Sequence, residues 1–299
     1  MAFDSDERTM PTAGRIAGYS RLIKTLDLFV PPPFERHAVA DRQTHIQQDQ
    51  WVVHPSPRWP GDAIVDHLIF ALKYEGINLL ILKHVFEAIG EDLLTEGLRE
   101  KPGSGYVRRL AFLYEWLTES RLPIADTATG NYVAVLDERL QYAGKAAIRH
   151  RRFRILDNLP GTPSFCPLVA RTQTLDRYLA KNLSARASDL LKTAPPEVLA
   201  RAAAYLLLAD SKASFEIEKE RPTKVRVARW GAAIGRAGLF DLTTASLIEL
   251  QREVIGDDRF VRIGLRNEAG FVGNRNSFNE PIPDHISAHA EDLQDLMTD

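Results

Sequence analysis

The feature that most restricts the fold of this chain is a helical repeat of apolar residues between positions 62 and 119. Leu79, Leu82, Phe86, Ile89 and Leu93 follow one another by three or four positions, which places them on one stripe of an α-helix. The same period occurs on both sides of this stretch, in Ile64, Leu68, Ala71 and Leu72 and again in Tyr106, Leu110, Leu113 and Leu117. The sequence therefore predicts three amphipathic helices between Asp62 and Glu119.

The prolines of residues 1–61 limit the secondary structure that this segment can form. Three consecutive prolines begin at Pro31, and three more lie between positions 55 and 60. Because proline lacks a backbone N–H and its ring clashes with the preceding helical turn, this density excludes long helices. Only Trp51-Val52-Val53 has the composition of a short strand. We expect an irregular, proline-rich N-terminal segment.

Further helices and one hairpin are expected toward the C-terminus. Pro222 should end a helix that begins at Thr193, and Thr223 should cap the next one. A third helix is predicted over 244–255 and a short hairpin over 270–273. With a strand at 132–136 and a last helix near 291, the fold is predicted to be mainly α, in three parts: 1–61, a mostly helical 62–192, and 193–299.

Charge and cysteine content exclude several classes of protein. The chain has 38 basic and 40 acidic side chains and a formal net charge of -2, so no overall attraction to nucleic acid or anionic lipid is expected. Cys166 is the one cysteine, which excludes an intrachain disulfide and a multi-cysteine zinc site. The acidic N-terminus resembles no targeting signal, and no apolar run approaches the length of a membrane span. We expect a soluble, cytoplasmic protein without a membrane partner.

One basic run stands apart from this balance, at Arg149-His150-Arg151-Arg152-Phe153-Arg154. Such a run can contact phosphate or an acidic partner, and it is the single argument for a DNA-binding role. The alternative, which we favour, is a solvated face beside a domain junction. Nucleic acid is therefore not an expected partner.

The usual catalytic signatures are missing from the sequence. It contains no His-Glu-x-x-His pair, no phosphate-binding loop ending in Gly-Lys-Ser or Gly-Lys-Thr, and no Gly-x-Ser-x-Gly turn. His285 and His289 are four residues apart, but the prolines at 281 and 283 make a regular helix there doubtful. No catalytic and no metal-ligating residue is predicted.

One segment is more specific. Ser214 and Glu218 are four residues apart and lie on one face of an expected helix. The pattern resembles the inhibitory helix of the Fic family, in which Ser or Thr is followed after three residues by Glu and then by Gly or Asn. Lys219 stands at the position where that family has Gly or Asn.

The likeness continues in order along the chain. Phe271, Val272 and Gly273 lie where the family has its target-docking hairpin, called the flap. The matching order and spacing extend over residues 205–297, through segments 264–266, 270–273, 281–287 and 292–297. Segments 106–117 and 158–169 resemble the long N-terminal extension of some bacterial Fic proteins.

The resemblance implies a fold and an activity. It implies a Fic-like helical domain, incomplete at its C-terminus, with a short β-hairpin flap and a mixed, mostly helical N-terminal extension. Fic enzymes are nucleotidyltransferases that transfer AMP from ATP to a hydroxyl side chain of a target protein, a reaction called AMPylation, with Mg²⁺ on the phosphates. In the family, the inhibitory glutamate, here Glu218, pairs with an arginine of the catalytic loop and competes with the γ-phosphate, an arrangement that produces autoinhibition. Ser214 would brace that helix.

The sequence departs from the family at the catalytic loop. The loop His-Pro-Phe-x-Asp/Glu-Gly-Asn-Gly-Arg, which supplies the base, the metal-binding acid and the anion cradle, does not occur in these 299 residues. We therefore expect the regulatory and target-docking portion of a longer enzyme, inactive alone, with no productive binding of ATP or Mg²⁺.

Two other expectations accompany this one. The alternative function is a non-catalytic interaction protein, an antitoxin-like regulator of a Fic enzyme or of another partner. Helices of the missing core would cover Trp230, Leu247 and Leu250, so we expect these side chains to be partly exposed and the chain to self-associate.

Overall fold

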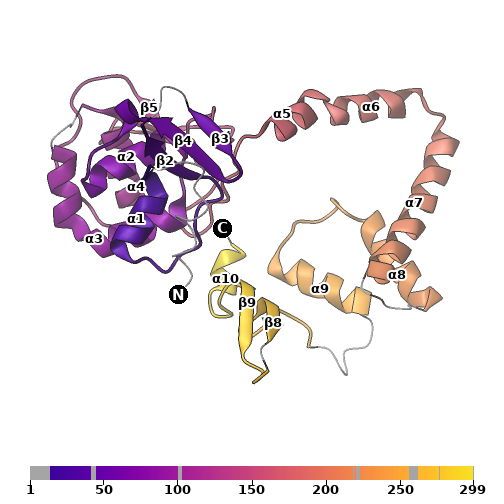
Figure 1. The fold of residues 1–299 in the computed structure, drawn as a ribbon. Helices are drawn as coiled ribbons and strands as arrows, with labels where there is room; N and C mark the ends of the chain where they lie inside the picture. Colours follow the sequence, from indigo (N-terminus) through magenta and orange to yellow (C-terminus); the bar gives the residue numbers. More distant parts are fainter. Residues whose placement is uncertain are drawn as a thin grey trace. The chain divides into compact units, whose positions relative to one another are not determined.

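The computed structural model describes residues 14–41, 45–99, 103–217, 219, 223–255, 262–275 and 277–298. About 48% of the chain is helical, with a few small sheets, so the prediction of a mainly α fold is confirmed. The chain forms two compact units, Met1–Asp176 and Arg177–Asp299, each of which is described by itself (Figure 1). This division falls between 176 and 177, whereas the sequence placed its second boundary between 192 and 193.

The first unit begins with a sheet where the sequence predicted an irregular segment. The strands have the order β1-β2-β4-β3, with β2 parallel to β4 and the other two pairs antiparallel. Their bounds are β1 Arg15–Ala17, β2 Arg36–Ala40, β3 Ile46–Gln48 and β4 Trp51–Pro55, with helix α1 Gly18–Leu26 after β1 and a 3-10 turn η2 Ser56–Arg58 after β4.

The prolines of residues 1–61 lie at positions that are compatible with a sheet. Pro31, Pro32 and Pro33 lie in the connection between α1 and β2, and Pro55 is the last residue of β4. Prolines at these positions interrupt helices but leave the strand ladders between them intact. Proline spacing therefore limits the length of the elements here without making the segment irregular.

Three helices follow the sheet, as the apolar period predicted: α2 Ile64–Tyr74, α3 Leu79–Arg99 and α4 Gly105–Thr118. Helix α3 is broken at Gly90, which has φ 69° and ψ 179°. The break shifts the buried face by one position. Leu93, which the stripe predicted to be buried, is 43% exposed, whereas Leu94 and Leu98 are buried.

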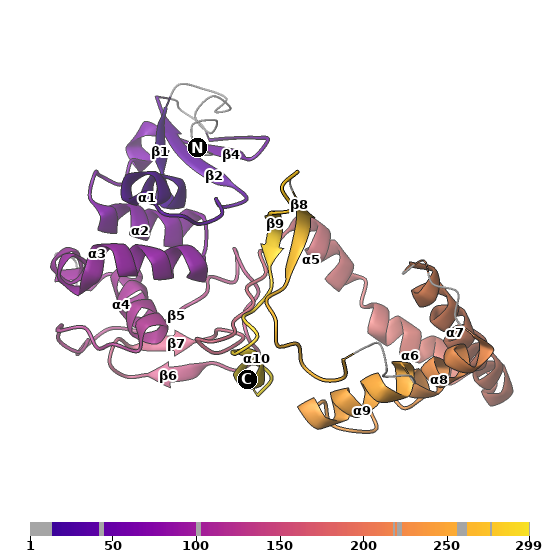
Figure 2. The ribbon, with the colours of Figure 1, turned by 90° about the horizontal axis from the view of Figure 1, so that it is seen from below.

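A second small sheet lies beside α4, in the order β5-β7-β6 (Figure 2). Its strands are β5 Val133–Ala134, β6 Ile148–His150 and β7 Ile155–Asp157. The predicted strand at 132–136 is thus shorter than expected. The Asn158 side chain extends the pairing, because its amide accepts from Leu136 N at 2.8 Å and donates to Leu136 O at 3.2 Å.

One core joins the helices of this unit. It contains apolar side chains of α1, α2, α3 and α4 together with residues that follow them, including Leu22, Leu68, Leu82, Leu110, Leu113, Phe153 and Ile155. A smaller cluster lies in the first sheet around Trp51 and Val53. Burial of these side chains provides most of the favourable free energy of folding.

The second unit has far less buried apolar surface. Its elements are α6 Leu183–Thr193, α7 Pro196–Ile217, α8 Lys224–Gly235, α9 Thr244–Ile255, β8 Phe271–Arg275, β9 Pro281–Ile286 and α10 Leu293–Leu296, while α5 Gln173–Ala180 crosses the division. The Thr223 side chain accepts from Arg226 N, which confirms the predicted cap of α8. Among its described residues, Phe215, Val227 and Ala233 are the buried apolar ones.

The N-terminus of α1 is capped by His67 of α2 and by Glu75, the residue that follows α2. Ala17, which precedes α1, has no side-chain acceptor of its own. Gly18 N donates to His67 Nδ1 at 3.2 Å, and Tyr19 N donates to Glu75 Oε1 at 3.0 Å. These contacts satisfy two of the N–H groups that every helix leaves unpaired at its start. Gly18 has φ 64°, and a Cβ there would lie 1.5 Å from Glu75 Oε1.

We expect Gly18→Ala to lower the free energy of unfolding by roughly 2–3 kcal/mol, because it adds backbone strain and displaces the capping carboxyl. Gly90→Ala is the matched control, since Gly90 has φ 69° and no atom within 4 Å of an added Cβ. It should cost about 1 kcal/mol from strain alone. Urea denaturation of both variants measures the difference; equal losses would show that Glu75 moves aside without cost.

Candidate functional site

The structure places part of the predicted inhibitory segment. Ser214 lies in the last turns of α7, and its hydroxyl donates to Asp210 O at 3.0 Å. Helix α7 ends at Ile217 rather than near Glu220, and Lys219 has φ 56°, in the left-handed region. Glu218 lies outside the described residues.

The predicted hairpin exists but is larger than expected. Phe271, Val272 and Gly273 all belong to one strand, β8, which pairs antiparallel with β9. The sequence predicted a short hairpin at 270–273, whereas the second strand is the proline-containing segment Pro281–Ile286. Phe271 is half-buried, Val272 is 63% exposed, and the register shifts between Val272 and Gly273.

The two edges of this hairpin differ. Within the described residues the sheet has two strands, so each strand has one side without a strand partner. Pro281 and Pro283 remove two backbone N–H donors from β9. Edge prolines oppose the addition of a further strand, so β8 offers the more complete backbone edge.

The structure also contains a pocket that sequence reasoning did not find. It lies in the first unit, has a volume of about 620 Å³, and is lined by residues of α1, β2, the α2–α3 connection and segments 139–141 and 166–172. Tyr19, His37, Glu75 and Gln141 contribute polar groups to its lining. The Tyr19 hydroxyl donates to Gly76 O at 2.9 Å and accepts from Asn78 N at 3.1 Å, which fixes the turn beside the pocket.

Glu75 is one of two glutamates that line this pocket; the other, Glu35, is exposed. Glu75 Oε1 accepts the Tyr19 N–H, whereas Glu75 Oε2 is buried without a hydrogen-bond partner. Burial, opposed in part by the Tyr19 N–H, raises the pKa of Glu75 to about 8. The carboxyl is therefore mostly protonated at neutral pH. Because Oε1 accepts a hydrogen bond, the proton belongs on Oε2.

Two histidines form a chain of hydrogen bonds that ends at the pocket. Arg58 can only donate, so His54 Nδ1, 3.1 Å from its Nη1, is an acceptor. Burial, with the charge of Arg58 next, lowers the pKa of His54 to about 4, so its one proton is on Nε2. That N–H donates to His37 Nδ1 at 2.9 Å.

The last nitrogen of this chain is a buried donor. Burial, with smaller contributions from His54 and His45, lowers the pKa of His37 to about 3, so its ring is neutral. Since Nδ1 accepts from His54, the remaining proton is on Nε2, an atom that is buried without a hydrogen-bond partner. His37 and Glu75 are both lining residues of the same pocket, while the Nε2 and Oε2 atoms themselves are buried.

A strand register brings the two histidines together. The parallel pairing of β2 with β4 sets His37 opposite Val52, and His54 follows two residues later on the same face. The sequence shows both histidines but no spacing that links them, because the link depends on which strands pair. The alternation of each histidine with valine and alanine is the sequence signal that could have indicated two buried strands.

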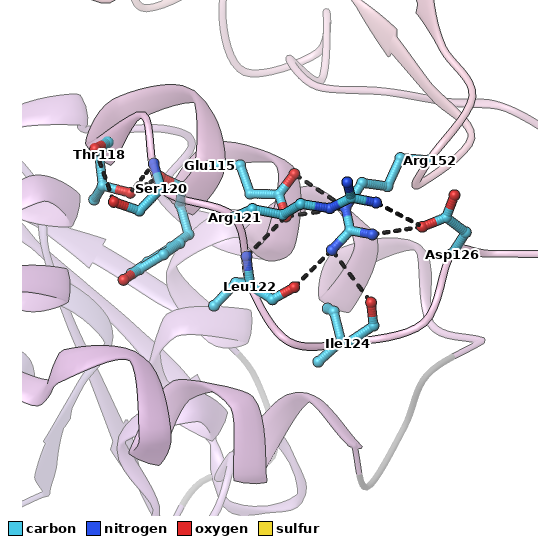
Figure 3. A network of polar contacts seen from close by, with 9 residues as sticks. Glu115, Thr118, Ser120, Arg121, Leu122, Ile124, Asp126 and Arg152 are labelled. Carbon is cyan, nitrogen blue, oxygen red and sulfur yellow. Dashed lines mark hydrogen bonds and ion pairs between the residues drawn. The ribbon is translucent and has the colours of Figure 1, made fainter.

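Arg152, in the middle of the basic run, belongs to a structural network rather than to a free charged surface. The Arg152 guanidinium donates to both carboxylate oxygens of Glu115, to Asp126 and to the carbonyls of Leu122 and Ile124 (Figure 3). The Arg152 side chain is only 18% exposed. Both readings of the run fail for this residue, since its charge is neither solvated nor available to a partner.

Two further arginines of the run are engaged by one aromatic ring. The guanidinium carbons of Arg149 and Arg154 lie 5.6 Å and 5.1 Å from the centre of the Tyr132 ring. Such contacts are favourable cation–π interactions. Arg152 is thus paired with carboxylates, whereas Arg149 and Arg151 are exposed.

Comparisons with known proteins identify no relative. No protein-family model, curated protein or solved structure matches this chain. Within the described ranges, no group of three or more His, Cys, Asp or Glu side chains is placed to hold a metal ion. His285 lies in β9, so it shares no helix face with His289. None of the described helices is long and apolar enough to cross a membrane.

We expect Arg152→Lys to lower the free energy of unfolding by roughly 1–3 kcal/mol, because lysine cannot reproduce the bidentate and carbonyl contacts of a guanidinium. Arg151→Lys is the matched control at an exposed position and should change stability by less than about 0.5 kcal/mol. Thermal melts of both variants measure the difference in stability. Similar melting temperatures would mean that the Arg152 contacts contribute little to stability.

We expect Glu75→Gln to become more stabilising as pH rises. The pKa of Glu75 in the folded chain, about 8, lies above its ordinary value of 4.5. Its favourable contribution is therefore complete below about 4.5 and is lost as pH rises toward 8. Glutamine keeps the acceptor for Tyr19 N without this loss, so the variant should gain roughly 2–4 kcal/mol over the unchanged chain between pH 5 and 9.

The measurement is urea denaturation at a series of pH values. Glu96→Gln, an exposed substitution on α3, should show no such trend. A stability difference that stays constant from pH 5 to 9 for Glu75→Gln would contradict the assignment of a protonated carboxyl.

Proposed function

We propose that this chain is the regulatory and target-docking part of a Fic-type protein adenylyltransferase, an enzyme class that transfers AMP from ATP to a hydroxyl side chain of a target protein. The observation that carries the proposal is the β8–β9 hairpin, which forms where the sequence resemblance places the flap. The resemblance itself extends over residues 205–297.

The hairpin has the properties that strand addition requires. An extended target segment gains affinity from main-chain hydrogen bonds to a free strand edge and needs little side-chain specificity. The prolines of β9 direct such a segment to β8. Val272 on β8 and Ile286 on β9, 63% and 66% exposed, offer apolar contacts on the hairpin.

The end of α7 supports the regulatory half of the proposal. Lys219, at φ 56°, occupies the position where the family has Gly or Asn, the two residues that most readily adopt left-handed backbone. Ser214 is hydrogen-bonded within the last turns of the same helix. The proposed role of Glu218 is to pair with a catalytic-loop arginine and so exclude the γ-phosphate from its productive position.

ATP and Mg²⁺ belong to the family's catalytic loop. The residues present here do not fit them, because the sequence contains no His-Pro-Phe loop with its acid and glycine-rich anion cradle. In this proposal the base and the anion cradle come from outside these 299 residues, and no step of AMP transfer is assigned to the chain itself.

A non-catalytic role as an antitoxin-like regulator is the second candidate, and one observation favours it. The second unit exposes many large apolar side chains along α6 and α7, namely Leu183, Leu190, Leu191, Val198, Tyr205, Leu206 and Leu208. Trp230, Leu247 and Leu250 are half-buried, as the sequence predicted. Such surface favours association with a protein partner or with a second copy.

The docking role can be tested by grafting. Residues 264–288 replace the flap of an active Fic adenylyltransferase, and label transfer from a fluorescent ATP analogue to its target is measured. We expect the graft to support transfer and Val272→Asp within it to reduce transfer about tenfold or more, because a charge on an edge strand opposes strand addition.

Phe278→Asp is the control for this graft. Residue 278 is 83% exposed and lies in the turn, outside both strands, so its replacement should leave transfer unchanged. A graft as inactive as an enzyme without a flap, or equal effects of the two aspartates, would contradict target docking by β8.

A further inference from the structure

We propose that residues 29–34, between α1 and β2, form a polyproline II ligand for a groove of aromatic side chains on a partner protein. The segment has three consecutive prolines, at 31–33, between Phe29 and Phe34. It belongs to the first unit, whereas the hairpin and α7 belong to the second. The inference therefore does not rest on the proposed Fic function.

Covalent geometry fixes the backbone of this segment. The proline ring holds φ at about −65° in each of residues 31–33. A residue that precedes proline is restricted to extended or polyproline II backbone, and Val30, Pro31 and Pro32 all precede one. All peptide bonds of the described residues are trans, and no backbone hydrogen bond within the described chain involves residues 29–35. The segment therefore has the conformation and the free backbone of a polyproline II helix.

Burial along the segment follows the threefold period of that helix. Val30 is buried in the core of the first unit and Pro33 is half-buried, whereas the residues between and beside them are exposed. Phe29 and Phe34 are 96% and 81% exposed. One edge of the helix therefore rests on the protein. The other two edges, each with one proline and one phenylalanine, face solvent.

The exposed edges select the kind of partner. Grooves that recognise polyproline II ligands are lined by aromatic side chains, against which the rings of exposed prolines pack. Phe29 is the most exposed large apolar side chain that the structure describes, and with Phe34 it would add apolar area at both ends of such a contact. Because the prolines and the buried Val30 already hold the segment in place, little conformational entropy is lost on binding.

The charges beside the segment indicate the rim of that groove. Asp27 and Glu35 flank the segment, and both carboxylates are exposed. No basic residue lies between them in the sequence. A groove with a basic side chain at its rim complements this pattern, whereas an anionic lipid surface does not.

The test uses the full chain and three isotope-labelled probes: one SH3, one WW and one EVH1 domain. Each domain is titrated with the chain while its NMR chemical shifts are followed. We expect saturable binding at submillimolar concentration to at least one probe, with the shifts confined to its aromatic groove. Failure of all three to bind, or shifts outside the groove, would overturn the proposal.

Substitutions locate the contact on the chain. Pro32→Ala releases the backbone and removes an exposed ring, so we expect about tenfold weaker binding. Pro57→Ala, at an exposed proline of η2, is the matched control and should bind as the unchanged chain does. Phe29→Ser should also weaken binding about tenfold, whereas Phe278→Ser, at a residue 83% exposed, should not. Equal affinities within either pair would contradict the assignment.

Lipid binding is the competing explanation for two exposed phenylalanines. Cosedimentation with vesicles of phosphatidylcholine and phosphatidylserine distinguishes it, and circular dichroism melts verify that each variant folds. We expect no binding to the vesicles. Vesicle binding that Phe29→Ser abolishes and Pro32→Ala retains would assign the segment to a membrane surface and overturn the proposal.

Discussion

The start of helix α1 is the point on which the first unit depends. Its first two N–H groups are satisfied by His67 and Glu75, side chains that come about fifty residues later in the sequence. This cap fixes α1 against α2, and Gly18 permits the close approach. Glu75 is also a lining residue of the pocket, so the residue that orders the helix start forms part of the cavity wall.

Sequence periodicity predicted helices α2, α3 and α4 of the first unit, but it missed helix α1 and most of the sheet. Helices α2, α3 and α4 follow from local spacing, because each buries one stripe of its own residues. The sheet β1-β2-β4-β3 depends on pairing between segments, which spacing does not encode. Gly90 shows a second limit: one residue with positive φ moved the buried face from Leu93 to Leu94.

For the candidate sites too, local sequence patterns were predictive and long-range arrangements were not. Ser214 and the Phe271–Gly273 segment were found because a motif places them within a short stretch of sequence. The pocket was not found, because its lining comes from segments far apart in the sequence, from Tyr19 to Thr172. Arg152 is the converse case, a residue whose charge looked available until its partners on α4 and the following loop were known.

The pattern of contacts in the second unit determines how far the structural effect of a mutation extends. Its main contacts between described elements join neighbours in sequence, α7 with α8, α8 with α9, and β8 with β9. The first unit instead joins distant elements, such as α1 with α3 and α2 with α4. Damage to one pair in the second unit therefore stays local, as in a linear array of repeats, whereas the first unit gains or loses its order as a whole.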